Sequence, residues 1–126
     1  MKVGEISDIY KALGDETRLR IFSLLLNGEL CVCELESLLG LSQANASRHL
    51  NRLSSAGITS KRKRSQWVYY SIDEKFSEAG SEIAAHVKKH TGKSDELKKD
   101  QARFAKYRKS GLSCDELKLQ KNKLFA

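Results

Sequence analysis

The spacing of apolar residues changes from helical to extended along residues 32–72, and this change limits the possible folds most strongly. Over about 32–39 the apolar residues recur as on one face of a helix, and Gly40 follows in a position that commonly ends helices. Ser42 is a suitable N-cap for a next helix that runs to about residue 56. Two short helices joined by a tight turn are typical of a helix-turn-helix.

An aromatic and β-branched segment, Gln66–Ile72, follows the second of these helices, and its alternate residues share one face. It predicts a two-stranded hairpin with the stretch that Ile58 opens. The tip near Arg64–Gln66 lacks the glycine or asparagine that short hairpin turns prefer, so we expect a longer or irregular loop. A helix-turn-helix followed at once by a hairpin predicts a winged helix.

The rest of the chain has helical periodicity. We expect helices that end at Gly14 and Asn27–Gly28, one continuous helix from Asp73 to Gly92, and further helices capped by Ser94 and Ser113. The expected fold is therefore mainly α with a small two-stranded β-hairpin. We expect two parts, a winged-helix DNA-binding and dimerisation domain over 1–92 and a charged helical extension over 93–126.

Composition excludes several classes of protein. Hydrophobic residues make up 40% of the 126, and no run approaches the roughly 20 apolar residues of a membrane-spanning helix. Met1–Glu5 is not followed by an apolar segment, so we expect no secretory signal. Three cysteines are an odd number, which argues against a disulfide scaffold and favours a cytoplasmic protein with reduced thiols and no membrane partner. No nucleophile–base pair or phosphate-binding glycine loop indicates an enzyme.

The positive charge is concentrated in two places: residues 61–64 contribute +4 and residues 91–126 a net +5, while residues 1–60 and 65–90 contribute −1 each, for a total of +7. On the helix after Ser42, the polar face carries Arg48 and Asn51, groups that suit phosphates and base edges in a major groove. The hairpin adds four consecutive basic residues, Lys61, Arg62, Lys63 and Arg64. This combination predicts binding to double-stranded DNA rather than RNA, since no aromatic platform for unpaired bases is evident.

Several segments together resemble the ArsR/SmtB family of metal-sensing bacterial repressors. The resemblance covers about residues 5–90 and rests on Ala12–Ile21, Glu29–Leu35, Leu41–Gln43, Ser47–Leu50 and Trp67–Tyr70. It implies a homodimeric winged-helix repressor that dimerises through terminal helices and leaves its operator DNA when an inducer binds. By position, the resemblance implies DNA contacts from Ser42, Gln43, Asn45, Ser47, Arg48, His49 and Arg52. An alternative interpretation is that His49 is a packed, hydrogen-bonded side chain.

Cys31 and Cys33 lie one residue apart at the predicted start of the helix over 32–39. Thiolates bind soft metals and metalloids, and a helix N-terminus is expected to lower the pKa of a thiol. Both cysteines could instead be small buried hydrophobic residues. In this place the resemblance implies that they bind arsenite or antimonite as inducer, with no organic cofactor.

A third ligand is needed because trivalent arsenic favours three thiolates. Some relatives have a third cysteine where this chain has Glu36, a poor substitute for a soft ligand. Cys114 is the only other thiol and could supply the third ligand from the same subunit or the other one. It could equally be an exposed or interface cysteine, and a small-molecule thiol or hydroxide could fill the third place.

Two other functions of the whole chain remain possible interpretations of the sequence. The trigger could be oxidation of the cysteines to disulfides, or the chain could be a basic architectural DNA-binding protein with inert thiols. His86 and His90 have the i, i+4 spacing of some zinc sites, but the acidic and histidine partners of the family's zinc site are missing upstream. We read them as a solvated feature or the edge of a dimer.

Overall fold

A computed structural model describes all 126 residues. Eight helices and three short strands follow one another as α1 Val3–Leu13, α2 Glu16–Leu25, β1 Leu30–Cys31, α3 Val32–Leu39, α4 Gln43–Ser55, β2 Thr59–Arg64, β3 Trp67–Ile72, α5 Glu74–Ala79, α6 Ser81–Thr91, α7 Asp95–Ser110 and α8 Cys114–Leu124. This mainly helical winged helix-turn-helix is the predicted fold class. No helix combines the length and apolar composition needed to cross a lipid bilayer.

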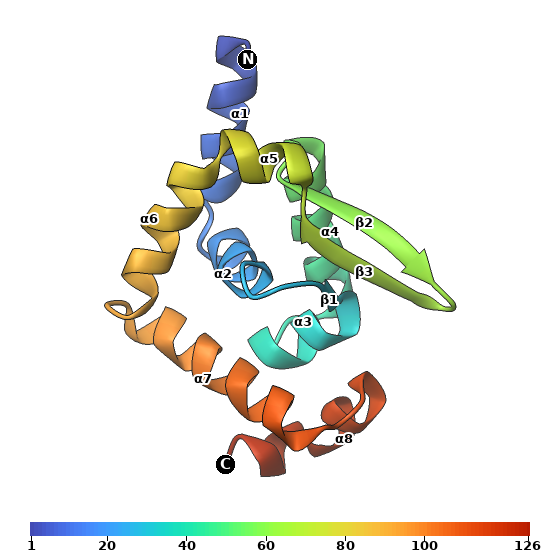
Figure 1. Cartoon of the computed structure of the whole chain (residues 1–126). Helices are drawn as coiled ribbons and strands as arrows, with labels where there is room; N and C mark the ends of the chain where they lie inside the picture. The colour runs from blue at the N-terminus through green and yellow to red at the C-terminus, as the bar shows by residue number, and fades with distance from the viewer.

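Helix α2 lies in the middle of the molecule, with the other helices and the sheet arranged around it (Figure 1). Its Ile21, Phe22 and Leu24 are completely buried, which explains the wide apolar stripe in the sequence. Burying one side chain of this size contributes about 1.5–3 kcal/mol, so α2 supplies much of the stabilisation of the core. Asp15 caps α2 as expected, because its side chain accepts a hydrogen bond from the Arg18 amide.

The predicted helix-turn-helix is confirmed as α3 and α4. Gly40 ends α3 in the left-handed conformation (φ +68°), which glycine adopts without steric cost. Ser42 then caps α4 by accepting a hydrogen bond from the Asn45 amide. The buried Leu50 and Leu53 hold α4 against the core, so its opposite, polar face is left to solvent.

The sheet has three antiparallel strands in the order β1–β3–β2, not the expected two. The additional strand, β1, pairs Cys31 with Tyr69 of β3. A strand of two residues has no periodicity to detect, which is why the sequence did not reveal it. This pairing joins the segment before α3 directly to the wing, the hairpin formed by β2 and β3 (Figure 1).

The wing ends in a tight loop, so the expected longer loop is wrong. Arg64 pairs with Trp67, leaving only Ser65 and Gln66 between the strands. Ser65 adopts a positive φ of 58°, the conformation that glycine or asparagine would take more easily. The side-chain hydroxyl of Ser65 also donates to Gln66 Oε1 at 3.1 Å.

The expected single helix over residues 73–92 is in fact two helices, α5 and α6, which meet at Gly80. The ring of Phe76 packs against this glycine so closely that a Cβ there would lie 2.5 Å from Phe76 Cζ. Any larger residue would force the Phe76 ring to move, and the chain turns at that point. Apolar periodicity continued across the break and therefore concealed it.

The C-terminal helices α7 and α8 pack on the rest of the molecule, with contacts to α2 and α3 (Figure 1). The guanidinium of Arg20 donates two hydrogen bonds of 2.9 Å to the buried carboxylate of Asp100. Leu117 of α8 is completely buried. The predicted caps are confirmed at Ser94 and at Ser113, which forms a capping box with Glu116.

Candidate thiol site and nucleic-acid interface

All three cysteines meet at one place, although Cys114 lies more than 80 residues after the other two. Their three sulfur atoms lie within 4.8 Å of one another. Cys31 Sγ is 3.8 Å from Cys33 Sγ and 3.5 Å from Cys114 Sγ. The sulfur atoms of Cys33 and Cys114 are in direct contact, and their Cα atoms are 6.3 Å apart. The three thiols come from a single chain.

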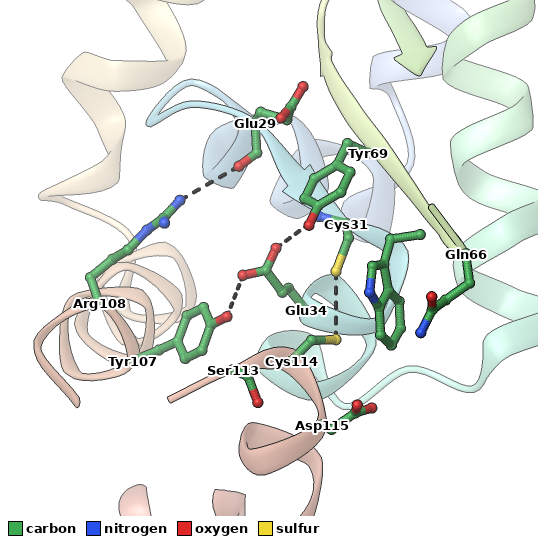
Figure 2. Close-up of a pocket in the computed structure, with 11 residues that line it drawn as sticks. Glu29, Cys31, Glu34, Gln66, Tyr69, Tyr107, Arg108, Ser113, Cys114 and Asp115 are labelled. Atoms are coloured by element: carbon green, nitrogen blue, oxygen red, sulfur yellow. Dashed lines mark hydrogen bonds between the residues drawn. The ribbon is translucent and has the colours of Figure 1, made fainter. Parts of the chain in front are cut away.

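Two helix N-termini create this convergence. Cys31 ends β1 and is the N-cap of α3, Cys33 follows in the first turn, and Cys114 is the first residue of α8. Figure 2 shows Cys31 and Cys114 directed toward one another. The chain brings the two starts together because α7 and α8 both pack on α3.

A buried polar network supports the thiol site. The carboxylate of Glu34 accepts a hydrogen bond from the Cys31 amide at 2.9 Å and a second one from the hydroxyl of Tyr107 (Figure 2). Glu34 and Tyr107 are 8% and 6% exposed, so their polar atoms depend on each other rather than on water. Sequence reasoning missed this pair. The spacing of Cys31 and Glu34, with an acidic residue three positions after an N-cap, resembles a capping box and was the available signal.

The expectation that the helix N-terminus lowers the thiol pKa is wrong for Cys31. The pKa of Cys31 is raised to about 11. Burial is the main cause and the neighbouring Glu34 carboxylate adds to it, while backbone hydrogen bonds lower the pKa by a smaller amount. Only 2% of Cys31 is exposed, so removing water from the thiolate outweighs the helix dipole. Burial and the bond to Glu34 likewise raise the pKa of Tyr107.

The thiol site borders two cavities. The first, of about 540 Å³, is lined by eleven residues, namely Glu29, Cys31, Glu34, Gln66, Trp67, Tyr69, Tyr107, Arg108, Ser113, Cys114 and Asp115 (Figure 2). The second, of about 360 Å³, lies between α4 and the wing and is bordered by Cys31, Cys33 and residues of α4 including Gln43, Ser47 and Asn51. The thiols thus lie between the C-terminal extension on one side and the predicted DNA-contacting elements on the other.

The predicted DNA-contacting residues of α4 fall into two groups. Ser42, Gln43, Asn45 and Arg48 are exposed and Ser47 is partly exposed. His49 is buried, and its Nδ1 lies 3.2 Å from a guanidinium nitrogen of Arg18. Burial lowers the pKa of His49, which fits a neutral ring that accepts a hydrogen bond from Arg18. His49 therefore belongs to the inner side of the helix, as the alternative interpretation predicted.

Two of the predicted arginines are engaged in ion pairs. Arg52 donates to Asp8 Oδ1 of α1 at 2.7 Å. On the wing, Arg62 donates to both carboxylate oxygens of Glu29 at 2.6 and 2.8 Å, and this contact lowers the pKa of Glu29. Lys61, Lys63 and Arg64 of the wing are exposed and carry no ion pair. The ion pair between the wing and the start of β1 could not be read from the sequence.

His86 and His90 lie on α6 with their Nε2 atoms 3.2 Å apart. The three cysteines are the only group of three histidine, cysteine or carboxylate side chains in the structure that could hold a metal ion. No third ligand therefore joins the two histidines. The histidine pair thus lacks the set of ligands that closes a structural zinc site.

Comparison with known proteins identifies the same elements. A family model described as "Bacterial regulatory protein, arsR family" matches residues 15–61. The chain is 44% identical over 71 residues to the "Cadmium resistance transcriptional regulatory protein CadC homolog" of Staphylococcus aureus, covering 56% of this chain and 59% of that protein. It is 51% identical over 65 residues to the "Arsenic resistance transcriptional regulator ArsR1" of Pseudomonas putida, covering 51% of each chain. The chain thus matches only about half the length of these relatives.

Solved structures extend the likeness. Reduced HlyU from Vibrio cholerae is 33% identical, with a TM-score of 0.61, over 73% of this chain and 90% of that one. A homodimeric winged helix-turn-helix DNA-binding domain from Mycobacterium bovis, a possible ArsR-family regulator, is 26% identical with a TM-score of 0.62, over 70% of this chain and 82% of that one. These relatives are regulators of transcription and not enzymes, as the sequence predicts. The chain therefore belongs to the arsR family of bacterial regulatory proteins.

Proposed function

We propose that this chain is a DNA-binding transcriptional repressor that releases its operator when trivalent arsenic or antimony binds Cys31, Cys33 and Cys114. The observation that carries the proposal is the meeting of three sulfur atoms within 4.8 Å, from two segments that are far apart in the sequence. Soft thiophilic ions are the ligands that such a donor set favours. The two relatives named for arsenic and cadmium resistance support an ion as the inducer.

The number of donors favours arsenic or antimony over zinc. Trivalent arsenic and antimony form three bonds, one for each of the three thiols. Zinc sites are almost always four-coordinate, and the cluster contains no fourth cysteine, histidine or carboxylate. All three donors come from one chain, so each subunit would hold its own ion.

DNA binding is proposed through the exposed face of α4 and the wing. Gln43, Asn45 and Arg48 offer amides and a guanidinium to base edges and phosphates, while Lys61 and Lys63 offer charge. The homodimeric relative from Mycobacterium bovis supports a dimer, whose two α4 helices would enter successive major grooves about 34–36 Å apart. Such a dimer would carry +14, twice the charge of the chain, and gain affinity by counterion release.

The thiol site and the DNA-contacting elements share direct connections. Cys31 pairs with Tyr69 of the wing, and α3, which contains Cys33, packs on α4. An ion bound to all three thiols would fix the start of α8 to the start of α3 and to the wing strand. If closing the thiols around the ion displaces α3 or the wing strand, the position of α4 relative to the wing changes. A coupling free energy of about 1–3 kcal/mol would lower DNA affinity roughly 5–150-fold.

An operator mobility shift with arsenite tests this proposal under reducing conditions. We expect arsenite to release DNA from the wild type but not from Cys33→Ser or Cys114→Ser, while all three proteins bind DNA equally without arsenite. His86→Ala, on the exposed side of α6, serves as the control and should respond like the wild type. Arsenite that leaves the wild-type affinity unchanged would reject the proposal.

The contact between Cys33 and Cys114 supports a second candidate, a repressor triggered by oxidation. Their Cα separation of 6.3 Å lies within the range of about 4.4–6.8 Å that disulfides require. Peroxide would then release DNA reversibly, with Cys31 keeping its free thiol. Release by peroxide together with insensitivity to arsenite would favour this candidate. A third possibility, a basic DNA-binding protein without a sensor, predicts that a Cys31→Ser, Cys33→Ser double variant behaves as wild type toward both reagents.

A further inference from the structure

The two faces of the wing carry separate sets of basic residues. Lys61 lies opposite Tyr70 in the hairpin, and both border the cavity between α4 and the wing. Arg62 lies opposite Tyr69, so its side chain is on the other side of the hairpin, which we call the outer face. The guanidinium of Arg64 also reaches the outer face, where its Cζ is 5.5 Å from the centre of the Tyr69 ring. The wing therefore offers positive charge on both sides and not only toward α4.

The C-terminal extension adds a third guanidinium to the outer face. Arg108, near the end of α7, donates a hydrogen bond of 3.5 Å to the carbonyl oxygen of Glu29, just before β1 (Figure 2). Its Cζ lies 5.0 Å from the centre of the Phe104 ring, so an aromatic side chain of the same helix supports it. Arg108 is nevertheless exposed, and no carboxylate forms an ion pair with it. Its charge is therefore open to a partner from outside the chain.

Only one carboxylate is paired within this group of three arginines. The hydrogen bond from Arg62 and the charges of Arg62 and Arg64 lower the pKa of Glu29, so Glu29 is ionised. The exposed Asp115 lies across the cavity from Arg108 (Figure 2). Three guanidiniums thus share the single charge of Glu29, and this surplus of positive charge on an exposed surface favours an anionic partner.

We propose that Arg64 and Arg108 bind phosphates of the DNA strand that passes the outer face of the wing, so that the C-terminal extension is part of the DNA interface. The inference rests on the DNA binding of the proposed function and adds a further surface to it. Phosphates line both edges of a DNA groove, so a hairpin that lies in a groove has a backbone on each of its faces. The face toward α4 carries Lys61 and Lys63, whereas the outer face carries arginines, whose planar forks match phosphate oxygens.

The two outer arginines have a defined role because Glu29 holds Arg62 against the sheet. Arg64 and Arg108 remain as the cations without an ion pair. Contacts to phosphates fix the position of a protein on the duplex but carry no base sequence information. The outer face should therefore add affinity equally for every DNA sequence, and the added affinity should depend on salt.

DNA titrations test this with an operator that the wild-type protein selects from random duplex DNA. Arg108→Gln removes the charge, and Arg108→Lys keeps it without the planar fork. The matched control is Lys98→Gln, because Lys98 is exposed on the same helix, about 15 Å nearer its start. Each protein is titrated at several salt concentrations. Hydroxyl-radical footprinting maps the protected positions, and a second, shortened duplex lacks the outermost of them. Thermal unfolding checks that each variant folds, and Arg64→Gln provides an independent test from the wing.

We expect Arg108→Gln to lower the logarithmic salt slope by about 0.9 for each lost phosphate contact, hence by about 1.8 for a dimer. It should weaken binding to the operator and to unrelated duplexes by the same factor, and lose protection at the outermost positions. Arg64→Gln should behave in the same way, while Arg108→Lys and Lys98→Gln should keep the wild-type slope. On the shortened duplex, Arg108→Gln and the wild type should bind equally.

The inference is overturned if Arg108→Gln keeps the wild-type slope and footprint, or if Lys98→Gln lowers the slope as much. It is also overturned if Arg108→Lys lowers the slope as far as Arg108→Gln does, because the bond to Glu29 and not the charge would then matter. A wild type that binds no duplex DNA would instead refute the proposed function itself.

Discussion

The hydroxyl of Tyr107 in α7 donates a hydrogen bond to the carboxylate of Glu34 in α3, and both side chains are buried. The same carboxylate accepts from the amide of Cys31. Tyr107 lies seven residues before Cys114, at the end of the helix that leads to it. The bond therefore ties the segment that carries one thiol to the turn that carries the other two.

We expect Tyr107→Phe to loosen this tie while keeping the packing of the ring. Loss of a buried hydrogen bond to a charged group should lower the free energy of unfolding by about 1.5–3 kcal/mol and weaken arsenite binding severalfold. Urea denaturation and arsenite titration measure the two effects. The matched control is Tyr10→Phe, which removes the hydroxyl of an exposed tyrosine in α1 and should change neither quantity. Unchanged arsenite affinity in Tyr107→Phe would show that the bond does not position the thiols.

The ion pair between Arg20 and Asp100 should hold α7 on α2. Removing one partner of a buried pair costs about 3–5 kcal/mol, and the Arg20 side chain is 26% exposed, so we expect Asp100→Asn to lose about 1–3 kcal/mol. Because the pair anchors the extension, the variant should also bind arsenite more weakly. The control is Asp95→Asn, at an exposed position in the first turn of the same helix. Calorimetry and arsenite titration that show equal behaviour of the two variants would contradict this anchoring role.

The ion pair between Glu29 and Arg62 should limit the charge that the wing offers to DNA. In Glu29→Gln the guanidinium of Arg62 becomes free to contact a phosphate. We expect tighter DNA binding at low salt and a steeper dependence of affinity on salt, by about 0.9 in the logarithmic slope for each additional phosphate contact. Glu78→Gln removes the same charge from the exposed side of α5 and controls for net charge. Equal salt slopes in the two variants would mean that Arg62 does not reach DNA.

The buried His49 should make the protein less stable in mild acid. Burial lowers the pKa of His49 in the folded state, and the cations Arg18 and Arg48 act in the same direction against the opposing Asp15. The unfolded chain, with a histidine pKa near 6.5, therefore takes up the proton at a higher pH than the folded chain. We expect the free energy of unfolding to fall as the pH drops below about 6.5. Urea denaturation should show a smaller decrease in His49→Gln, and an equal decrease would contradict this origin.

Local sequence signals were sufficient for most of the fold. Gly40 and Ser42 fixed the turn and the start of α4 through their own backbone preferences, and Ser94 and Ser113 did the same for α7 and α8. The features that were missed depend on side-chain packing and strand pairing, which apolar periodicity does not record. Gly80, where α5 and α6 meet, lies under the ring of Phe76, and β1 exists because Leu30 and Cys31 pair with Tyr70 and Tyr69 of β3.

In the candidate site, too, local signals were visible in the sequence and contacts between distant residues were not. The spacing of Cys31 and Cys33 and the position of Cys114 at a helix start were visible in the sequence. The bond of Glu34 to Tyr107 was not, because it joins residues 73 positions apart. The direction of the pKa shift of Cys31 was also missed, since a helix N-terminus can be read from the sequence but burial cannot.

Arsenic K-edge X-ray absorption of the reduced protein with one equivalent of arsenite counts the sulfur ligands directly. If Cys31, Cys33 and Cys114 bind one ion, the wild type should show three As–S bonds and no As–O bond, and Cys114→Ser should show two As–S bonds and one As–O bond. Two As–S bonds in the wild type, unchanged in Cys114→Ser, would contradict the three-thiol site and exclude the C-terminal extension from it.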